Sequence, residues 1–232
     1  MSGPAQDYIR IEDEQCRRIT YFYLNPSPEM VESDIREEAG KGYYTDPRTS
    51  TLWVFWGMVF RQFPDRIAGW LEALSDLPLL EREFVYQAAW FSDCPESHSC
   101  LEKLIKSGGE ETAFLELLTS EQPLDLLTME ISHPAHLDML WNAFMASGDK
   151  AVVERIIGVL SWLQDDSDIA KLLIRKTAAW SLASNAFQHG RVMDICREQL
   201  ANCPDEVRDK LQQVIKVAET AWNDKEETPQ EN

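Results

Sequence analysis

The amino-acid sequence predicts an all-α fold in which irregular helical-hairpin repeats pack as a compact α-solenoid-like domain. Two stretches repeat bulky apolar residues at offsets of three and four, which places them on one helical stripe. A short polar, proline or glycine break follows each stretch and leads into a second amphipathic run, whereas strand-like patterns are sparse. Two amphipathic helices joined by a short turn form a helical hairpin, the unit from which α-solenoids are stacked. The two stretches are Leu52, Phe55, Trp56, Val59 and Phe60, and Leu137, Leu140, Trp141, Phe144 and Met145.

The pattern of charged and apolar residues divides the chain into three segments. Residues 1–25, which mix charges with an aromatic cluster, are expected to form an N-terminal helix docked on the body. Residues 26–222 are expected to form a single helical-repeat domain. Residues 223–232 are polar and poor in apolar side chains, so we expect a disordered acidic tail there.

Prolines and glycines divide the first half of this domain into successive helices. Ser27 is a candidate helix cap, with Pro28 at the first helical position, and Gly40 ends that helix. The helix over about residues 48–63 is apolar almost all round, which is typical of a central helix covered on several sides. Pro64 begins the next helix. The expected helices cover residues 28–39, 48–63, 64–74, 79–91, 95–106 and 110–118.

The second half shows longer and cleaner helical patterns. Gly148 and Gly190 lie where the chain must reverse. An Asn-Ala-Phe triplet at residues 142–144 recurs at 185–187, and this irregular spacing differs from that of an evenly phased repeat array. The expected helices cover residues 133–146, 150–163, 167–189, 192–201 and 204–222. Eight tryptophans are more than usual, and we expect most of this excess to lie in the core.

The charge balance of the chain disfavours two classes of partner. Forty acidic residues against 22 basic ones give a formal charge of −18, the wrong sign for displacing counterions from nucleic acid or for binding anionic membranes. Residues 64–130 contribute 14 acids and only four basic residues. This excess is either a solvated face that keeps the protein soluble or a surface complementary to a basic partner. The candidate surface consists of Glu72, Asp76, Glu81, Glu83, Glu102, Glu110, Glu111 and Glu116.

Targeting signals and disulfides are not expected from this sequence. The N-terminal residues lack the apolar core of a signal peptide, and no apolar run approaches the roughly 20 residues that span a bilayer. A cytoplasmic location is therefore expected. The five cysteines are an odd number in a chain too large to require disulfides, so reduced thiols are expected.

Two short clusters have residue types that bind metals, although their surroundings favour structural roles. Cys94, His98 and Cys100 offer three soft ligands, but no fourth ligand is near in sequence, and a helix beginning at Pro95 would spread them around its axis. His133 and His136 could share one helical face, and a carboxylate–histidine site with Glu130 and Asp138 can be drawn. A helix N-terminus at His133, followed by Pro134, explains that pattern equally well. Neither a metal nor a cofactor is expected.

Two further groups of residues have simple structural explanations. The acidic run at residues 165–168 lacks the glycine and the distant glutamate of a calcium-binding loop, and Ser167 or Asp166 as a helix cap accounts for it. His189 and Cys196 are about two helical turns apart, roughly 10 Å, which is too far for a catalytic hydrogen bond. No nucleophile elbow or phosphate-binding glycine loop is present, so no catalytic residue is assigned.

The layout of the chain resembles an uncharacterised group of bacterial α-helical proteins. The shared features are a Tyr-rich, Pro-punctuated segment near the N-terminus and a pattern that reads Leu137, Trp141, Phe144, Gly148 and Asp149, followed by Val153, Ile156 and Ile157. A last shared element is the run from Ala178 to Ala186. The resemblance covers about residues 21–200 and implies a helical-repeat fold similar to HEAT or tetratricopeptide arrays. It implies no activity, substrate or catalytic residue.

Two functions from different classes are compatible with these patterns. The favoured one is a non-enzymatic module that binds a protein partner, with a basic partner as one option, through a concave or acidic surface, as an adaptor, a secretion chaperone or an immunity-type inhibitor. The alternative is an enzyme or small-ligand-binding domain whose site is assembled from distant residues. Candidates for that site are Tyr43, Tyr44, His133, His136 and Asp165.

Overall fold

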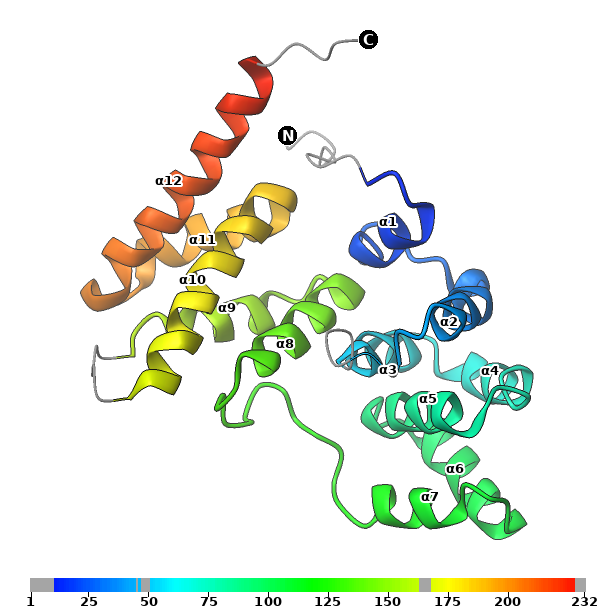
Figure 1. The fold of residues 1–232 in the computed structure, drawn as a ribbon. Coiled ribbons are helices and arrows are strands. Elements are labelled where there is room, and N and C mark those ends of the chain that lie inside the picture. Colours follow the sequence, from blue (N-terminus) through cyan, green and yellow to red (C-terminus); the bar gives the residue numbers. More distant parts are fainter. Residues whose placement is uncertain (1–10, 45, 47–50, 163–167, 228–232) are drawn as a thin grey trace. The chain divides into compact units, whose positions relative to one another are not determined.

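A computed structural model describes residues 11–44, 46, 51–162 and 168–227 of the chain, and within these ranges every regular element is a helix (Figure 1). Twelve α-helices and two short 3₁₀ helices are present there, and the described residues contain no strand. The predicted all-α class is therefore confirmed. None of the described helices is both long enough and apolar enough to cross a membrane.

The contacts within the chain define two compact units, whereas the sequence suggests one domain over residues 26–222. The N-terminal unit consists of Asp13–Met129 and Asn142–Gly148. The C-terminal unit consists of Met1–Glu12, Glu130–Trp141 and Asp149–Asn232. Helix α8 (Pro134–Ser147) contributes residues to both units.

The helices of the N-terminal unit follow the predicted succession, with two differences at their starts. The segment after Ser27 begins as a 3₁₀ helix, and Ser27 makes no side-chain cap. Pro64 likewise opens a 3₁₀ turn before the next α-helix. The elements are α1 (Glu14–Thr20), η1 (Pro28–Met30), α2 (Val31–Gly40), α3 (Leu52–Gln62), η2 (Pro64–Arg66), α4 (Ile67–Ala73), α5 (Leu79–Phe91), α6 (Pro95–Ser107) and α7 (Thr112–Thr119).

Helix α3 lies in the core of the N-terminal unit, as its apolar sequence predicts. Phe55 and Phe60 are completely buried, and Trp56 is 2% exposed. The helix packs against α5 so closely at Gly57 that an added Cβ would lie 2.5 Å from Cδ1 of Phe91. Only glycine fits at this crossing, because any Cβ would overlap the facing helix.

The C-terminal unit is built around helix α10, which packs against three other helices. Its elements besides part of α8 are α9 (Lys150–Val159), α10 (Ile169–Gln188), α11 (Gly190–Asn202) and α12 (Asp205–Glu227). Asp168 caps α10 by accepting a hydrogen bond from the Lys171 backbone amide (3.0 Å). The expectation that Ser167 or Asp166 provides this cap is corrected, since the helix begins one to two residues later; those two lie outside the described residues.

Helix α12 extends into the segment that is expected to be a disordered tail. It continues to Glu227, through half of that segment, and residues 228–232 lie outside the described residues.

Most of the tryptophans are expected in the core, and four of them are buried there: Trp53, Trp56, Trp70 and Trp141. Trp180 differs from them because 72% of its surface is exposed.

Candidate functional site

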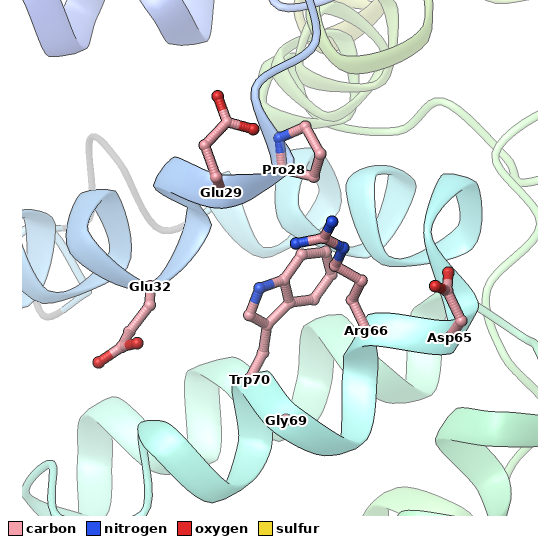
Figure 2. Close-up of a pocket in the computed structure, with 7 residues that line it drawn as sticks. All are labelled: Pro28, Glu29, Glu32, Asp65, Arg66, Gly69 and Trp70. Atoms are coloured by element: carbon pink, nitrogen blue, oxygen red, sulfur yellow. The ribbon is translucent and has the colours of Figure 1, made fainter.

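The N-terminal unit contains an open hollow of about 540 Å³ between two segments that are far apart in the sequence. Figure 2 shows its lining: one side comes from η1 and α2, and the other from η2 and α4. The lining residues are Pro28, Glu29, Glu32, Asp65, Arg66, Gly69 and Trp70. The hollow therefore combines charged side chains with one large aromatic ring.

Proline-initiated turns place the acidic side chains of the hollow. Pro28 and Pro64 each start a 3₁₀ turn, and the next residue in each turn is acidic, Glu29 and Asp65 respectively. Proline favours the first position of a helix because its φ is already helical and its missing N–H is not needed there. The same local sequence, proline followed by an acid, thus supplies a carboxylate from both sides of the hollow.

Trp70 gives the hollow an apolar, rigid part. Its indole stacks on the ring of Phe60, with ring centroids 5.2 Å apart and an interplanar angle of 25°. Only 7% of Trp70 is exposed, so an edge of the ring faces the hollow while the rest belongs to the core. A side chain fixed in this way loses little conformational entropy when a ligand packs against it.

The charges around the hollow favour a cation. Three carboxylates and one guanidinium line it, which leaves a net lining charge of −2. Glu32 is oriented by Arg36, whose Nε lies 3.1 Å from its Oε1. Arg36 also pairs with Asp76 (2.8 Å), so one arginine links the second helix to the end of the fourth. Figure 2 shows the Arg66 side chain next to the Trp70 ring, so an incoming ammonium or guanidinium group would share the hollow with one cation of the chain.

Four of the eight residues of the expected acidic surface are held in ion pairs. Glu102 pairs with Lys106 at 3.4 Å, and Asp76 pairs with Arg36 as described. Arg82 of α5 bridges to Glu110 and also to Glu111, the latter at 3.5 Å. Glu111 is only 6% exposed, so it is a structural residue more than a surface one.

The other four residues of that expected surface belong to three different helices. Glu72 of α4 and Glu116 of α7 are exposed, whereas Glu81 and Glu83 of α5 are half-buried. The structure brings Glu110 and Glu111 together around Arg82, but none of the eight lines the hollow. The expected acidic surface and the hollow therefore lie in the same unit and consist of different side chains.

The cysteine–histidine cluster of α6 is taken up by local packing. The Cys94 thiol lies 3.2 Å from the Ser92 hydroxyl in a small buried group that includes Ser97. The His98 ring instead packs on Trp90, with centroids 4.7 Å apart. Among the described residues, no group of three His, Cys, Asp or Glu side chains is arranged to hold a metal ion.

The two histidines at the start of α8 both accept hydrogen bonds from nearby backbone amides. Nδ1 of His133 accepts from the Ala135 amide (3.1 Å), and Nδ1 of His136 accepts from the Ser132 amide (3.2 Å). The first bond satisfies an amide of the initial turn of α8, which a helix N-terminus otherwise leaves without a partner, and the second satisfies an amide just before the helix. The structure therefore agrees with the interpretation of a helix-terminal pair.

The residues of the alternative, enzymatic site are distributed over both units. Tyr43 and Tyr44 belong to the N-terminal unit and the two histidines to the C-terminal unit, while Asp165 lies outside the described residues. The Tyr44 hydroxyl donates to Oε2 of Glu38 (2.8 Å), and Trp56 Nε1 donates to the same oxygen (2.7 Å). This cluster is a feature of the core and is not open to a substrate, because Glu38 is completely buried.

Glu38 is the most perturbed carboxyl of the N-terminal unit. Burial raises its pKa from 4.5 to about 7, since the interior disfavours the charged form, although the hydrogen bonds from Trp56 and Tyr44 lower it in part. Its Oε1 has no hydrogen-bond partner among the described residues. Glu38 is one of several acids in α2, and only its position on the buried face of that helix distinguishes it.

Burial also perturbs the histidine and cysteine of the C-terminal unit that the sequence places two turns apart. It lowers the pKa of His189 from 6.5 to about 4 and raises the pKa of the Cys196 thiol from 9.0 to about 12. Both shifts disfavour the charged forms. A thiol with so high a pKa is not a nucleophile at neutral pH, so these residues are core side chains.

No protein-family model, curated protein or solved structure matches this chain. The sequence missed the hollow because its acidic residues are about 35 positions apart and come together only when α2 and α4 pack. The one local signal was the proline–acid pair that occurs at both Pro28 and Pro64.

Proposed function

We propose that the protein is a non-enzymatic protein-interaction module that binds a basic segment of another protein. The hollow beside Trp70 supports this proposal most directly, because carboxylates on two sides flank an aromatic edge. A lysine or arginine of the partner would place its cation among Glu29, Glu32 and Asp65. Its apolar stem would lie against the indole, an arrangement favourable to both parts of such a side chain.

The architecture and the overall charge also support binding of a basic protein. In this proposal the helical hairpins stack as irregular repeats, as the packing of α5 on α6, α6 on α7, α10 on α11 and α11 on α12 suggests. The formal charge of −18 would accelerate encounter with a basic partner. The proposed roles are those of a cytoplasmic adaptor, a secretion chaperone or an immunity-type inhibitor.

A pair of variants with equal net charge tests the proposal. The first changes the hollow, as Glu29→Gln, Glu32→Gln and Asp65→Asn, and the second changes exposed acids elsewhere in the same unit, as Glu72→Gln, Glu102→Gln and Glu116→Gln. The probe is a fluorescein-labelled peptide of alternating arginine and glycine, and the measurement is fluorescence anisotropy at low and at physiological salt. Since exposed ion pairs contribute about 0.2–1 kcal/mol each, the hollow variant should bind about tenfold more weakly.

The control variant should change the affinity by no more than about twofold, since net charge acts only through screened long-range attraction. Equal losses in the two variants would mean that the peptide senses net charge alone, and the hollow would then be no site. Absence of binding by the wild-type protein at low salt would contradict the proposal as a whole. Affinity capture from the source cell with both variants then identifies the partner, which must be retained by the control variant and lost by the hollow variant.

A further inference from the structure

Helix α10 of the C-terminal unit exposes a stripe of large apolar side chains. Ile169 is 67% exposed, Leu173 is 54% exposed and Trp180 is 72% exposed. An isolated exposed apolar residue is common on protein surfaces, but several aligned on one helix face, with a tryptophan among them, are typical of an interaction site. These residues take no part in the hollow beside Trp70, which belongs to the other unit.

The stripe has the spacing with which one helix packs along another. With Lys176, its members follow one another at intervals of four, three and four residues, so all four lie within about 60° of arc on the helix surface. This is the seam spacing of paired helices. The opposite face of α10 carries the buried Ile174, Ala178 and Leu182, which pack within the unit. We name Ile169, Leu173, Lys176 and Trp180 the α10 seam.

The charge of α10 is opposite to that of the whole chain. Residues 169–188 contain three basic residues and no acidic one, although the chain has a formal charge of −18. Lys171 is held by Asp168 (3.4 Å), and Arg175 donates to the Trp162 carbonyl (3.1 Å). Lys176 lies on the seam itself, is exposed, and makes no ion pair within the described ranges. The seam thus presents one available cation between apolar side chains.

We infer that the α10 seam is a docking site for an amphipathic helix of an acidic protein partner. The apolar side chains of that helix pack against Ile169, Leu173 and Trp180, and a carboxylate pairs with Lys176. This site is additional to the hollow beside Trp70, and it has the opposite charge preference. The protein would then have two recognition sites, a cation-binding one on the N-terminal unit and a carboxylate-binding one on the C-terminal unit.

Two other occupants of the seam are less compatible with its charge. A second copy that paired its own α10 antiparallel to the first would place Lys176 opposite Leu173, so the lysine would find no carboxylate on the facing seam. An anionic membrane is bound through clusters of about 4–8 basic residues, whereas the seam presents the single available cation of Lys176. The seam is also narrow, because its four residues span only about 60° of the helix surface and the opposite face is buried in the unit. A single partner helix fits this width better than a lipid surface.

Two synthetic helical peptides test the inference on the full chain. Both carry leucine at the outer positions of the four–three–four spacing. One carries glutamate at the two inner positions, so that either chain direction brings a carboxylate to Lys176, and the other carries lysine there. We expect the wild-type protein to bind the glutamate peptide at least about tenfold more tightly by fluorescence anisotropy. The variant Lys176→Glu should reverse this preference.

Matched apolar variants separate docking from general stickiness. Leu173→Ser and Trp180→Ala should each weaken binding of the glutamate peptide by about tenfold. Leu117→Ser is the control, because Leu117 is 73% exposed on a helix of the other unit, and it should leave the affinity unchanged. Circular dichroism should show the same helix content in all of these variants, since the altered side chains are exposed.

Several results would overturn the inference. It fails if the protein does not distinguish the two peptides, or if Lys176→Glu leaves the preference unchanged. It also fails if sedimentation shows a self-associated wild-type protein that Trp180→Ala dissociates, because the seam would then hold a second copy. Binding to phosphatidylglycerol vesicles that Trp180→Ala abolishes would assign the seam to a membrane instead. The arginine peptide used for the hollow should bind all of these variants normally, so the two proposals succeed or fail separately.

Discussion

Replacing Glu38 by glutamine should stabilise the protein above neutral pH and leave its stability nearly unchanged in acid. Glu38 is completely buried, and burial raises its pKa from 4.5 to about 7. Between pH 4.5 and about 7, Glu38 therefore stays protonated in the folded state, whereas it has lost its proton in the unfolded state. Stability associated with Glu38 is fully present below pH 4.5 and is lost as the pH rises toward 7.

The size of this effect follows from the difference between the two pKa values. A difference of about 2.5 corresponds to about 3 kcal/mol, because each pKa unit is worth about 1.4 kcal/mol. Glutamine has the shape of a protonated glutamate, and its carbonyl can still accept from Tyr44 and Trp56. The amide nitrogen of the glutamine would replace Oε1, which has no hydrogen-bond partner among the described residues. The wild type and the variant therefore share the cost of burying one polar atom without a hydrogen bond.

Urea unfolding followed by far-ultraviolet circular dichroism from pH 5 to pH 8 measures the effect. The free energy of unfolding of Glu38→Gln should exceed that of the wild type by up to about 3 kcal/mol at pH 8, and the difference should shrink steadily toward pH 5. Glu37→Gln is the control, because Glu37 is the neighbouring exposed acid, paired with Lys41 at 2.7 Å. It should change stability by no more than about 0.5 kcal/mol. A constant difference between Glu38→Gln and the wild type over this range would refute the reasoning.

Three further predictions concern packing and a buried histidine. Gly57→Ala should destabilise the protein by about 1–3 kcal/mol because the added Cβ overlaps the facing helix. Gly158→Ala should be neutral or slightly stabilising, because the space around Gly158 is open. Thermal unfolding of the two variants measures the difference. Trp56→Ala should cost about 3–5 kcal/mol in urea unfolding, but the exposed Trp180→Ala should cost about 0.5 kcal/mol or less, and equal costs would contradict the burial of Trp56. The pKa of His189 is lowered to about 4, so stability associated with it is present above pH 6.5 and is lost as the pH falls toward 4; His189→Gln should remove this acid sensitivity.

The sequence predicts the helices well because their signals are local. Pro95 opens a helix, and Gly108 ends it in the left-handed conformation with φ of 73°, as the sequence indicates. An apolar run interrupted by such residues has few alternatives to a helix. The exact starts are less predictable, since Pro28 and Pro64 are equally compatible with a 3₁₀ turn and with an α-helix.

The division into two units and the hollow beside Trp70 depend on long-range packing that no local pattern encodes. A stripe on a helix says that the helix packs, but not which other helix covers it. Trp180 shows the limit of composition, because its apolar neighbours in the sequence suggest a buried position. The face of α10 that carries Ile174 and Ala178 is buried, and Trp180 lies on the opposite, exposed face. The density of acids along the chain likewise does not indicate the hollow, since Glu29 and Asp65 line it together only because segments far apart in the sequence pack.

The two buried titratable groups oppose each other, which has a consequence for the whole chain. Between pH 4.5 and 6.5, Glu38 makes the folded state bind about one more proton than the unfolded state, whereas His189 has the opposite effect. Each contribution amounts to about 1.4 kcal/mol per pH unit, with opposite signs. Because Glu38 belongs to the N-terminal unit and His189 to the C-terminal unit, the contributions cancel only if the two units unfold together. A wild-type stability that is flat over this range, combined with opposite slopes in Glu38→Gln and His189→Gln, would therefore show cooperative unfolding of both units. If the units unfold separately, two transitions should instead move in opposite directions with pH.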